Sequence, residues 1–396
     1  MIGAVAISKG DSWTQKADFG GTWRFGAVSF SIGNKGYLGT GAQGNFAFKD
    51  FWEYDQSTNS WTQLADFVGT ARANSVAFSI DGKGYIGTSG NDSITPGRDF
   101  WEYDPNLNTW IRKAFFGGDS RFMAVGFSIG NKGYIGTGNT NGSGGVFDFW
   151  EYNPALNSWT QKAGLSYIVE GRMGAFGFSF NGKGYIGTGL NMNGPPTYLS
   201  DFWEYDTTLN SWTQKASFPL TRMGAVCFSI NNKGYAGAGA GDDTTGFKDF
   251  WEYNPSIDQW NRKTDIPSLN VFSTGVGFNI LNKGYVYIGD STNSFWEYSP
   301  DTATGINELS NPIKTTLYPN PFSTQTTLTI SGSGVVETPL MASLQIYDAS
   351  GKMVKNISVG DKKQITINRE GLKNGVYFIE VRIGEESIVK KVVVTN

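Results

Sequence analysis

Apolar and polar residues alternate through residues 12–300 in short runs that return at a regular interval. One interval reads RFGAVSFSI, KGYLGTG, KDFWEYD and SWTQLADF. Successive side chains of a strand point to opposite faces of its sheet, so FWEY sends its Trp and Tyr to one face and its Phe and Glu to the other. Bulk on both faces is typical of a sheet packed between two neighbours. Each interval therefore predicts four short strands.

Three sequence marks define the interval, and each occurs six times. WEY begins at Trp52, Trp101, Trp150, Trp203, Trp251 and Trp296. KGY begins at Lys35, Lys83, Lys132, Lys183, Lys233 and Lys283. A second tryptophan stands at Trp13, Trp61, Trp110, Trp159, Trp212 and Trp260. The period of roughly 45 to 53 residues is typical of four-stranded propeller blades.

Turn residues indicate which connections are tight. Five of the six linkers between the first two strands consist of Gly, Asn and Asp, which adopt positive φ at little cost. The third and fourth strands are joined by segments such as DPNLN, in which Pro and Asp favour a type I turn. We expect both connections to be tight hairpins.

The two ends of the repeat region complement each other. The sixth repeat lacks its Trp-containing fourth strand, whereas SWTQKADF, residues 12–19, precedes the first complete repeat. We expect this N-terminal strand to complete the sixth blade and close the ring, which removes two exposed sheet edges. The predicted fold is all-β, with a six-bladed propeller over residues 1–300.

These repeats resemble Kelch repeats, a family of six- or seven-bladed propellers. The resemblance lies in the Gly-rich second strand, the aromatic third strand and the Trp of the fourth strand. Two features depart from the family, because GTG or GAG stands where Kelch repeats have a double glycine, and the chain has no histidine. Copper oxidases of the Kelch type hold their metal with histidine, so that chemistry is not expected here.

The composition changes after Tyr298. Residues 301–316 are polar and rich in turn formers, which predicts a linker. Residues 317–396 hold alternating strands with SG and NG turns, which predict a small antiparallel Ig-like sandwich. The strings YPNP, YDASGK, GVYF and KKVVV, in this order, resemble the C-terminal type A sorting domain of the type IX secretion system of Bacteroidota.

That resemblance implies a secreted or cell-surface protein whose residues 317–396 address it to the type IX secretion machinery. Family members also carry a Sec signal peptide, and MIGAVAISKGDSW has neither the basic start nor the apolar length of one. We therefore expect the sequence to be truncated at its N-terminus or its start to be misassigned. No apolar run approaches the ~20 residues of a membrane-spanning helix.

Composition argues against several kinds of chemistry. The net charge is −3, and 32 Lys and Arg are spread among 35 Asp and Glu, so no nucleic-acid partner is expected. Histidine, the usual general base and zinc ligand, does not occur. Cys227 is the single cysteine and stands where other repeats carry Ala, Gly or Ser, so we interpret it as a packed thiol. We expect no cofactor and no metal.

Loop lengths divide the propeller into two faces. Both hairpin spans have constant lengths, whereas the connections between second and third strands and between successive repeats vary. Up-and-down strand order places both variable connections on one face, here called the variable face, and both hairpins on the other, the hairpin face. Because binding residues favour loops on a rigid scaffold, we expect the variable face to carry the function.

Five repeats share an Arg at the start of the first strand and an Asp before FWEY, and the sixth has Phe272 and Ser294 instead. A forked guanidinium suits a carboxylate, so we interpret these residues as structural ion pairs. The alternative is an Arg ring at the channel mouth that takes an anionic ligand. The residues are Arg24, Arg72, Arg121, Arg172 and Arg222, with Asp50, Asp99, Asp148, Asp201 and Asp249.

Three aromatic residues in the variable loops lie outside the repeat pattern: Trp23, Tyr167 and Tyr198. Aromatic rings beside amides and carboxylates suit stacking on sugar rings, although loop aromatics can equally pack their own loops. Polar contacts to a sugar would come from Asn191, Asn193, Asp242 and Asp243.

The sequence thus predicts an exported, monomeric, non-catalytic module that binds a glycan or a surface protein. Two alternatives remain open, a sugar-modifying enzyme of the sialic-acid mutarotase type and a structural spacer domain. No motif of the chain distinguishes a substrate, since the Glu of WEY occurs six times and cannot mark one active site.

Overall fold

The structure is a computed structural model. It describes residues 10–88, 97–140, 144–165, 171–242, 246–267, 275–301, 314–331, 342–349, 352–360, 364–383 and 386–396. The chain divides into two compact units, one covering Lys9–Thr302 and the other containing Ala303–Asn396.

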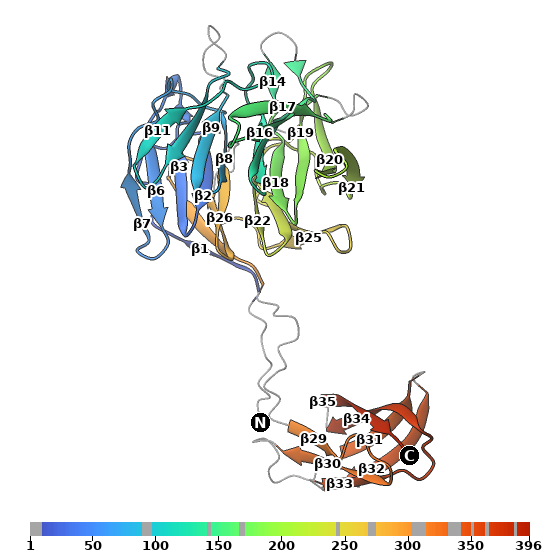
Figure 1. The fold of residues 1–396 in the computed structure, drawn as a ribbon. Helices are drawn as coiled ribbons and strands as arrows, with labels where there is room; N and C mark the ends of the chain where they lie inside the picture. The colour runs from blue at the N-terminus through green and yellow to red at the C-terminus, as the bar shows by residue number, and fades with distance from the viewer. Residues whose placement is uncertain are drawn as a thin grey trace. The chain divides into compact units, whose positions relative to one another are not determined.

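Within the described residues of the first unit, six antiparallel four-stranded sheets form the blades of a propeller (Figure 1). This confirms the predicted all-β, six-bladed architecture. Blades one to three consist of β2 (Val28–Ile32), β3 (Lys35–Gly39), β6 (Phe51–Asp55) and β7 (Ser60–Gln63); β8 (Val76–Ile80), β9 (Lys83–Gly87), β10 (Phe100–Asp104) and β11 (Thr109–Arg112); and β12 (Val125–Ile129), β13 (Lys132–Gly136), β16 (Phe149–Asn153) and β17 (Ser158–Lys162).

The remaining blades follow the same order, and the last takes its outer strand from the start of the chain. They consist of β18 (Phe176–Phe180), β19 (Lys183–Asn191), β20 (Thr197–Asp206) and β21 (Ser211–Lys215); β22 (Val226–Ile230), β23 (Lys233–Gly237), β24 (Phe250–Asn254) and β25 (Gln259–Lys263); and β26 (Val276–Ile280), β27 (Lys283–Tyr287), β28 (Phe295–Ser299) and β1 (Ser12–Gln15).

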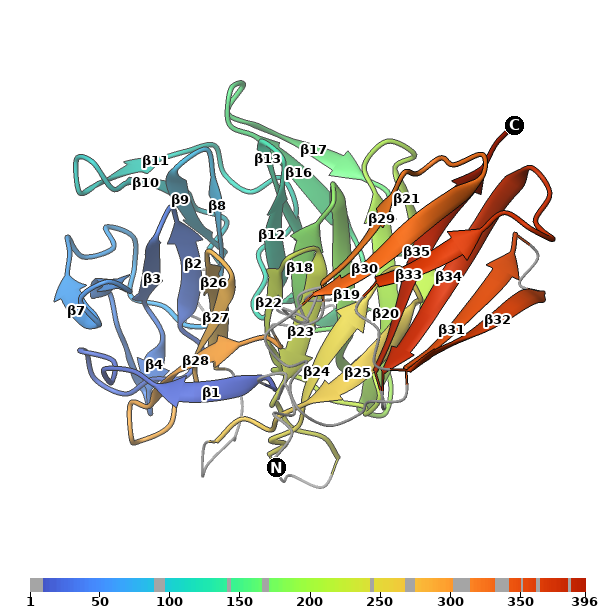
Figure 2. The same ribbon diagram turned by 90° about the horizontal axis from the view of Figure 1, so that it is seen from below.

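The N-terminal strand closes the ring as the sequence predicts. Strand β1 pairs antiparallel with β28 (Figure 2). In this pair Trp13 stands opposite Tyr298. The outer edge of the sixth sheet is thereby paired to a segment about 285 residues distant in the sequence, as the Trp13–Tyr298 register shows. Because a sheet edge left open is a template for unwanted pairing, this closure protects both ends of the repeat region.

A side-chain clasp joins each blade to the preceding one. In blade three the Oδ1 of Asn157 accepts hydrogen bonds from the Tyr152 hydroxyl and from the backbone N–H of Ala114, both at 2.9 Å. The indole N–H of Trp159 donates to the carbonyl oxygen of Ala114 at 3.3 Å. Both backbone groups of an outer-strand end are thus satisfied across the blade boundary.

The clasp of the sixth blade is built from N-terminal residues. Asp11 takes the place of the Asn, since its Oδ2 accepts from the backbone N–H of Thr264 at 2.7 Å and from the Tyr298 hydroxyl at 3.1 Å. The indole N–H of Trp13 donates to the Thr264 carbonyl oxygen at 2.9 Å. Ring closure therefore reproduces the side-chain contacts of the other blades as well as the strand.

The repeated aromatics form the core between blades. Phe51 packs with Tyr103 and Trp110 of the second blade, at ring-centroid distances of 4.9 and 5.0 Å. From the other face of the same strand, Tyr54 packs against Phe295 of the sixth blade at 4.8 Å. Both faces of FWEY are therefore used to bury bulk, and edge-to-face contacts of this kind add stability beyond the area buried.

Short hairpins extend three blades on the variable face, at the end of the blades where β14 lies in Figure 1. Blade one carries β4 (Ala42–Gln43) and β5 (Phe46–Ala47), and blade three carries β14 (Asn139–Thr140) and β15 (Gly144–Gly145). In blade four, β19 and β20 themselves continue outward, with Leu190 opposite Tyr198.

On the hairpin face the first hairpin turns hold residues at positive φ, as their Gly, Asn and Asp content predicts. Asp81 and Gly82 have φ of 48° and 76°. The sixth turn departs from this composition and places Leu281 at φ 54°, although left-handed backbone disfavours a side chain of this kind.

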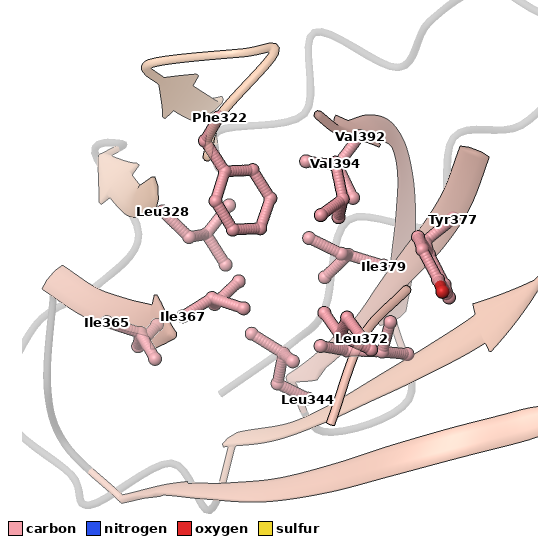
Figure 3. Packing of buried hydrophobic residues seen from close by; sticks show 11 residues of the cluster. Phe322, Leu328, Leu344, Ile365, Ile367, Leu372, Tyr377, Ile379, Val392 and Val394 are labelled. Atoms are coloured by element: carbon pink, nitrogen blue, oxygen red, sulfur yellow. The ribbon is translucent and has the colours of Figure 1, made fainter. Parts of the chain in front are cut away.

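The second unit contains two antiparallel sheets around one core. Their strands are β29 (Lys314–Tyr318), β30 (Gln325–Ser331) and β33 (Gln364–Asn368), and β32 (Met353–Gly360), β31 (Ala342–Asp348), β34 (Gly375–Ile383) and β35 (Glu386–Val394). Apolar side chains from both sheets meet between them, among them Leu328, Leu344, Ile367 and Ile379 (Figure 3). The unit is a small β-sandwich.

The YPNPF string ties the two sheets together. The amide of Asn320 donates to the Lys391 carbonyl oxygen at 3.0 Å and accepts from the Val393 N–H at 2.9 Å, as a neighbouring strand would. The backbone N–H of Phe322 then bonds the Val393 carbonyl oxygen at 3.0 Å. This segment therefore covers the C-terminal part of the β35 edge.

Candidate functional site

Each of the five Arg residues forms a two-point ion pair with the Asp of its own blade. In blade five, Nη1 and Nη2 of Arg222 bond the two carboxylate oxygens of Asp249 at 2.7 and 2.6 Å. The same two-point contact joins Arg24 to Asp50, Arg72 to Asp99, Arg121 to Asp148 and Arg172 to Asp201.

Nη1 of each Arg also bonds a backbone carbonyl oxygen, and so does Nε in blades one to three, whereas Nε of Arg172 and Arg222 has no partner among the described residues. In blade one, Nη1 of Arg24 also donates to the Thr40 carbonyl oxygen and Nε to the Thr22 carbonyl oxygen, both at 2.9 Å. All five Arg side chains are at most 1 % exposed. A guanidinium so enclosed has no surface to offer an anionic ligand, so this geometry favours the structural interpretation over the Arg ring.

In the five blades that carry the pair, the Trp of FWEY also bonds the Asp, a contact that sequence reasoning missed. The indole N–H of Trp52 donates to Asp50 at 2.8 Å, and that of Trp251 donates to Asp249 at 2.6 Å. The i to i+2 spacing places both side chains on one face of the strand, which is the signal that could have revealed the contact.

The electrostatics of Asp99 show what the pair does for the carboxylate. Burial alone would raise the pKa of Asp99, but the hydrogen bonds and charge of Arg72 and the N–H of Trp101 outweigh it. The pKa of Asp99 therefore lies below its ordinary value of 3.8. The carboxylate is held ionised by its partners, which is a structural rather than an acid–base arrangement.

The sixth blade lacks this arrangement. Ser294 occupies the position of the Asp and is 6 % exposed. Its hydroxyl and the indole N–H of Trp296 have no hydrogen-bond partner among the described residues. Phe272, which replaces the Arg in the sequence, lies outside the described residues.

The off-pattern candidates come from several blades. Trp23 is partly exposed beside Arg24, and Tyr198 is partly exposed on β20. Asn191 is 5 % exposed, and its Oδ1 accepts the backbone N–H of Asn193 at 2.8 Å. Asn193 is exposed, yet its amide donates to the carbonyl oxygen of Gly145 at 3.0 Å.

These contacts divide the candidates. Asn191 and Asn193 lie together and join the outer loops of blades three and four. Asp242 is exposed on blade five. Tyr167 and Asp243 lie outside the described residues.

Several exposed apolar side chains on the variable-face loops were not predicted, among them one in each of blades one, three and four. Phe46 is 75 % exposed at the tip of the β4–β5 hairpin. Phe147 of blade three and Met192 of blade four are each 41 % exposed. The signal for Phe46 was present in the string QGNFAF, where Gly44 at φ 57° makes the turn that projects the ring.

The propeller axis contains a channel. Its cavity has a volume of about 220 Å³ and takes its wall from three residues of each first strand. Cys227 lines it, is partly exposed along it, and donates through Sγ to the Gly177 carbonyl oxygen at 3.1 Å. Burial raises the pKa of the Cys227 thiol to about 12, so the thiol is not a ready nucleophile.

A belt of backbone hydrogen bonds surrounds the channel mouth toward the variable face. The N–H groups of Asn74, Met123, Gly174 and Gly224 each donate to the equivalent carbonyl of the preceding blade at 2.8 to 3.0 Å. All four residues have positive φ, including Met123 at 50°. Among the described residues, these bonds fix each of blades two to five to the preceding blade near the axis.

Within the part of the chain that the structure describes, no group of three or more Cys, Asp or Glu residues is placed to hold a metal ion. The same residues include no helix long and apolar enough to cross a membrane.

Comparison with known proteins bears on the two units separately. Residues 316–395 match the family model described as a secretion system C-terminal sorting domain. The C-terminal unit is a type IX sorting domain. It indicates a secreted or cell-surface protein, which confirms the predicted localisation, and it implies interaction with the secretion machinery.

A curated relative shares a short stretch. Beta-agarase A of Zobellia galactanivorans is 37 % identical over 75 residues, which are 18 % of this chain and 13 % of the agarase. The chain thus spans only a small part of the curated relative that it matches.

The propeller has a solved structural neighbour. The structure of YjhT matches with a TM-score of 0.57 and 18 % sequence identity, covering 68 % of this chain and 92 % of YjhT. At this identity the match shows the fold alone, and it agrees with the blade architecture described above.

Proposed function

We propose that the protein is an exported binding module that recognises a glycan through the variable face of its propeller. The single observation that carries the proposal is the set of exposed apolar side chains on loops of that face, represented by Phe46, Phe147 and Met192. These side chains stand on loops of a rigid propeller, and loops on a rigid scaffold are where binding residues are commonly found.

The chemistry of these residues supports a sugar ligand. A sugar ring has an apolar face of C–H groups, which an exposed aromatic ring can cover, and a rim of hydroxyl groups, which amides and carboxylates can bond. Trp23 and Tyr198 are partly exposed, and Asn193 and Asp242 are exposed, so all four are accessible for such contacts.

The mutarotase-type enzyme would need Arg and carboxylate groups that reach a substrate. The five Arg side chains are buried and each is paired with the Asp of its own blade, so they are not accessible to a substrate. The non-catalytic proposal is therefore preferred, and the spacer alternative predicts no binding in the experiment below.

A glycan array probed with the full chain tests the proposal. Trp23→Ala, Tyr198→Ala and Phe46→Ala are compared with wild type, and Leu107→Ala serves as the control, because Leu107 is an apolar residue 68 % exposed on the hairpin face. We expect the wild-type protein to bind a glycan. At least one variable-face variant should reduce this binding by about tenfold, and the control should bind like wild type. Conversion of a sugar by wild-type protein would favour the enzyme, and no binding would favour the spacer.

A further inference from the structure

The channel differs from the surface candidates because its wall carries no charged side chain. Its lining residues are Ala, Val, Ser, Gly and Phe, with Cys227 as the one titratable side chain among them. The cavity has a volume of about 220 Å³. The space is therefore suited to one small molecule rather than to a large ligand.

The polar groups of this wall come from the backbone. Each blade presents its first strand at the end of its sheet, so the inner edge of that strand pairs with no other strand of the same sheet; these strands are β2, β8, β12, β18, β22 and β26. An unpaired edge offers N–H donors and C=O acceptors that need partners. Six such edges around one axis give a wall with both kinds of group.

Side chains already use part of this edge. Across blade boundaries, the hydroxyl of Ser29 donates to the Gly277 carbonyl oxygen at 3.2 Å, and that of Ser229 donates to the Ser179 carbonyl oxygen at 2.9 Å. Hydroxyl groups are thus the partners that these strand edges accept within the protein itself. A ligand rich in hydroxyl groups would make the same kind of contact.

Charge and polarity narrow the ligand class. A charged molecule would lose its hydration in the channel without meeting an opposite charge, and an apolar molecule would leave strand-edge groups unsatisfied. An uncharged polyol meets neither cost, because each hydroxyl group both donates and accepts. The backbone belt at Asn74, Met123, Gly174 and Gly224 fixes the mouth beforehand, which limits the ordering that binding requires.

We propose that the central channel binds one uncharged sugar ring through hydrogen bonds to the inner edges of the first strands. This inference rests on the proposed function and deepens it, because it names the place where the terminal ring of a neutral glycan would enter. A free neutral monosaccharide presents the same chemistry.

The test uses the full chain titrated by calorimetry with glucose, galactose and mannose, and with glucuronate and glucosamine as charged counterparts. Cys227→Leu, which enlarges a residue of the channel wall, is paired with Cys227→Ser, which copies the residue that blade one carries at this position, Ser29. We expect at least one neutral sugar to bind with a Kd on the order of 1 mM. We expect Cys227→Leu to weaken binding about tenfold, Cys227→Ser to preserve it, and the charged sugars to bind more weakly than the neutral one.

Diffraction from wild-type crystals soaked in the same sugars locates the ligand and does not depend on the folding of Cys227→Leu. Density for a sugar ring in the channel supports the inference. Water alone in the channel, equal binding of charged and neutral sugars, or undiminished binding by a folded Cys227→Leu protein overturns it.

The two proposals fail separately. Glycan binding that Trp23→Ala abolishes, together with water alone in the channel of soaked crystals, removes the channel site and leaves the variable face. A neutral monosaccharide in the channel, without array signals that the variable-face variants change, removes the variable face and leaves the channel. The array and the monosaccharide titration also distinguish the end of a glycan from a free sugar.

Discussion

At the residue scale, Arg222 and Asp249 show why the repeated charges are structural. The Arg is 0 % and the Asp 6 % exposed, and each satisfies the other at two points. Removing one member of a buried pair leaves the other charge without a partner, which costs far more than the pair contributes as a whole.

We predict that Arg222→Ala lowers the free energy of unfolding by about 3–5 kcal/mol, the range for breaking a buried pair. Arg262→Ala is the matched control, because its ion pair with Asp265 has side chains 57 % and 50 % exposed. Exposed pairs contribute about 0–1 kcal/mol, so the control should stay close to wild type. Urea unfolding measures both, and equal losses for the two variants would argue against a structural role for the buried pair.

The Arg72–Asp99 pair predicts a pH dependence with a definite sign. The pKa of Asp99 is lower in the folded state than its ordinary value of 3.8, so the stability it contributes is fully present above that value. That contribution is lost as the pH falls through the folded-state pKa. We expect the free energy of unfolding to fall as the pH is lowered from about 5 to below about 3.8, the unperturbed pKa of Asp.

Asp99→Asn isolates this contribution. The variant should start from a lower stability at pH 7, because Arg72 loses its counter-charge, and should then lose less than wild type on acidification. Denaturant unfolding at a series of pH values gives both slopes. A variant with an unchanged acid slope would show that Asp99 does not supply the pH dependence.

At the element scale, the interblade clasp joins a hairpin that the sequence predicts to backbone groups of the preceding blade that it does not predict. The turn itself follows from local composition, since Asn157 adopts φ 47°, a conformation that Asn tolerates. Its contact with Ala114 joins residues 43 positions apart, and no local pattern indicates which backbone group the amide will reach.

We predict that Asn157→Ala destabilises the protein by about 2 kcal/mol, because the Ala114 N–H and the Tyr152 hydroxyl lose their acceptor and the Ala must adopt positive φ. Asn157→Asp is the matched control, since blade five carries Asp258 in the same role, accepting the Ala216 N–H at 3.0 Å. Thermal unfolding compares the two. A control as unstable as Asn157→Ala would show that the acceptor oxygen is not what stabilises the clasp.

Other elements mark the limit of sequence reasoning in the same way. The strands follow from alternation that is repeated six times, so errors in one copy are corrected by the others. The backbone belt does not, because Met123 takes φ 50° through contacts with the neighbouring blades rather than through its own preference. Phe46 was missed because one aromatic in a variable loop carries no periodic signal.

At the scale of the whole molecule, ring closure was the most informative prediction, because it came from counting strands. Five complete repeats, one repeat short of a strand and one unattached strand leave a single arrangement in which all six blades have four strands. The part played by Asp11 could not be predicted, since an Asp in place of the Asn of the other clasps becomes meaningful only once the strand is placed.

The central claim is that residues 12–15 form the outer strand of the sixth blade, and a cross-link tests it most directly. Ser12 and Ser299 are register partners in the β1–β28 pair. Opposite residues of an antiparallel pair have Cα atoms about 4.5–5.5 Å apart, within the range that a disulfide spans.

In a Cys227→Ser background, Ser12→Cys with Ser299→Cys is compared with Ser60→Cys and Ser299→Cys, in which Ser60 is the counterpart of Ser12 on β7 of blade one. The account predicts that mild oxidation joins the peptides containing positions 12 and 299 in the first protein and not those containing 60 and 299 in the second, as read by mass spectrometry. Cross-linking that is absent from the first protein, or equal in both, would contradict the closed ring.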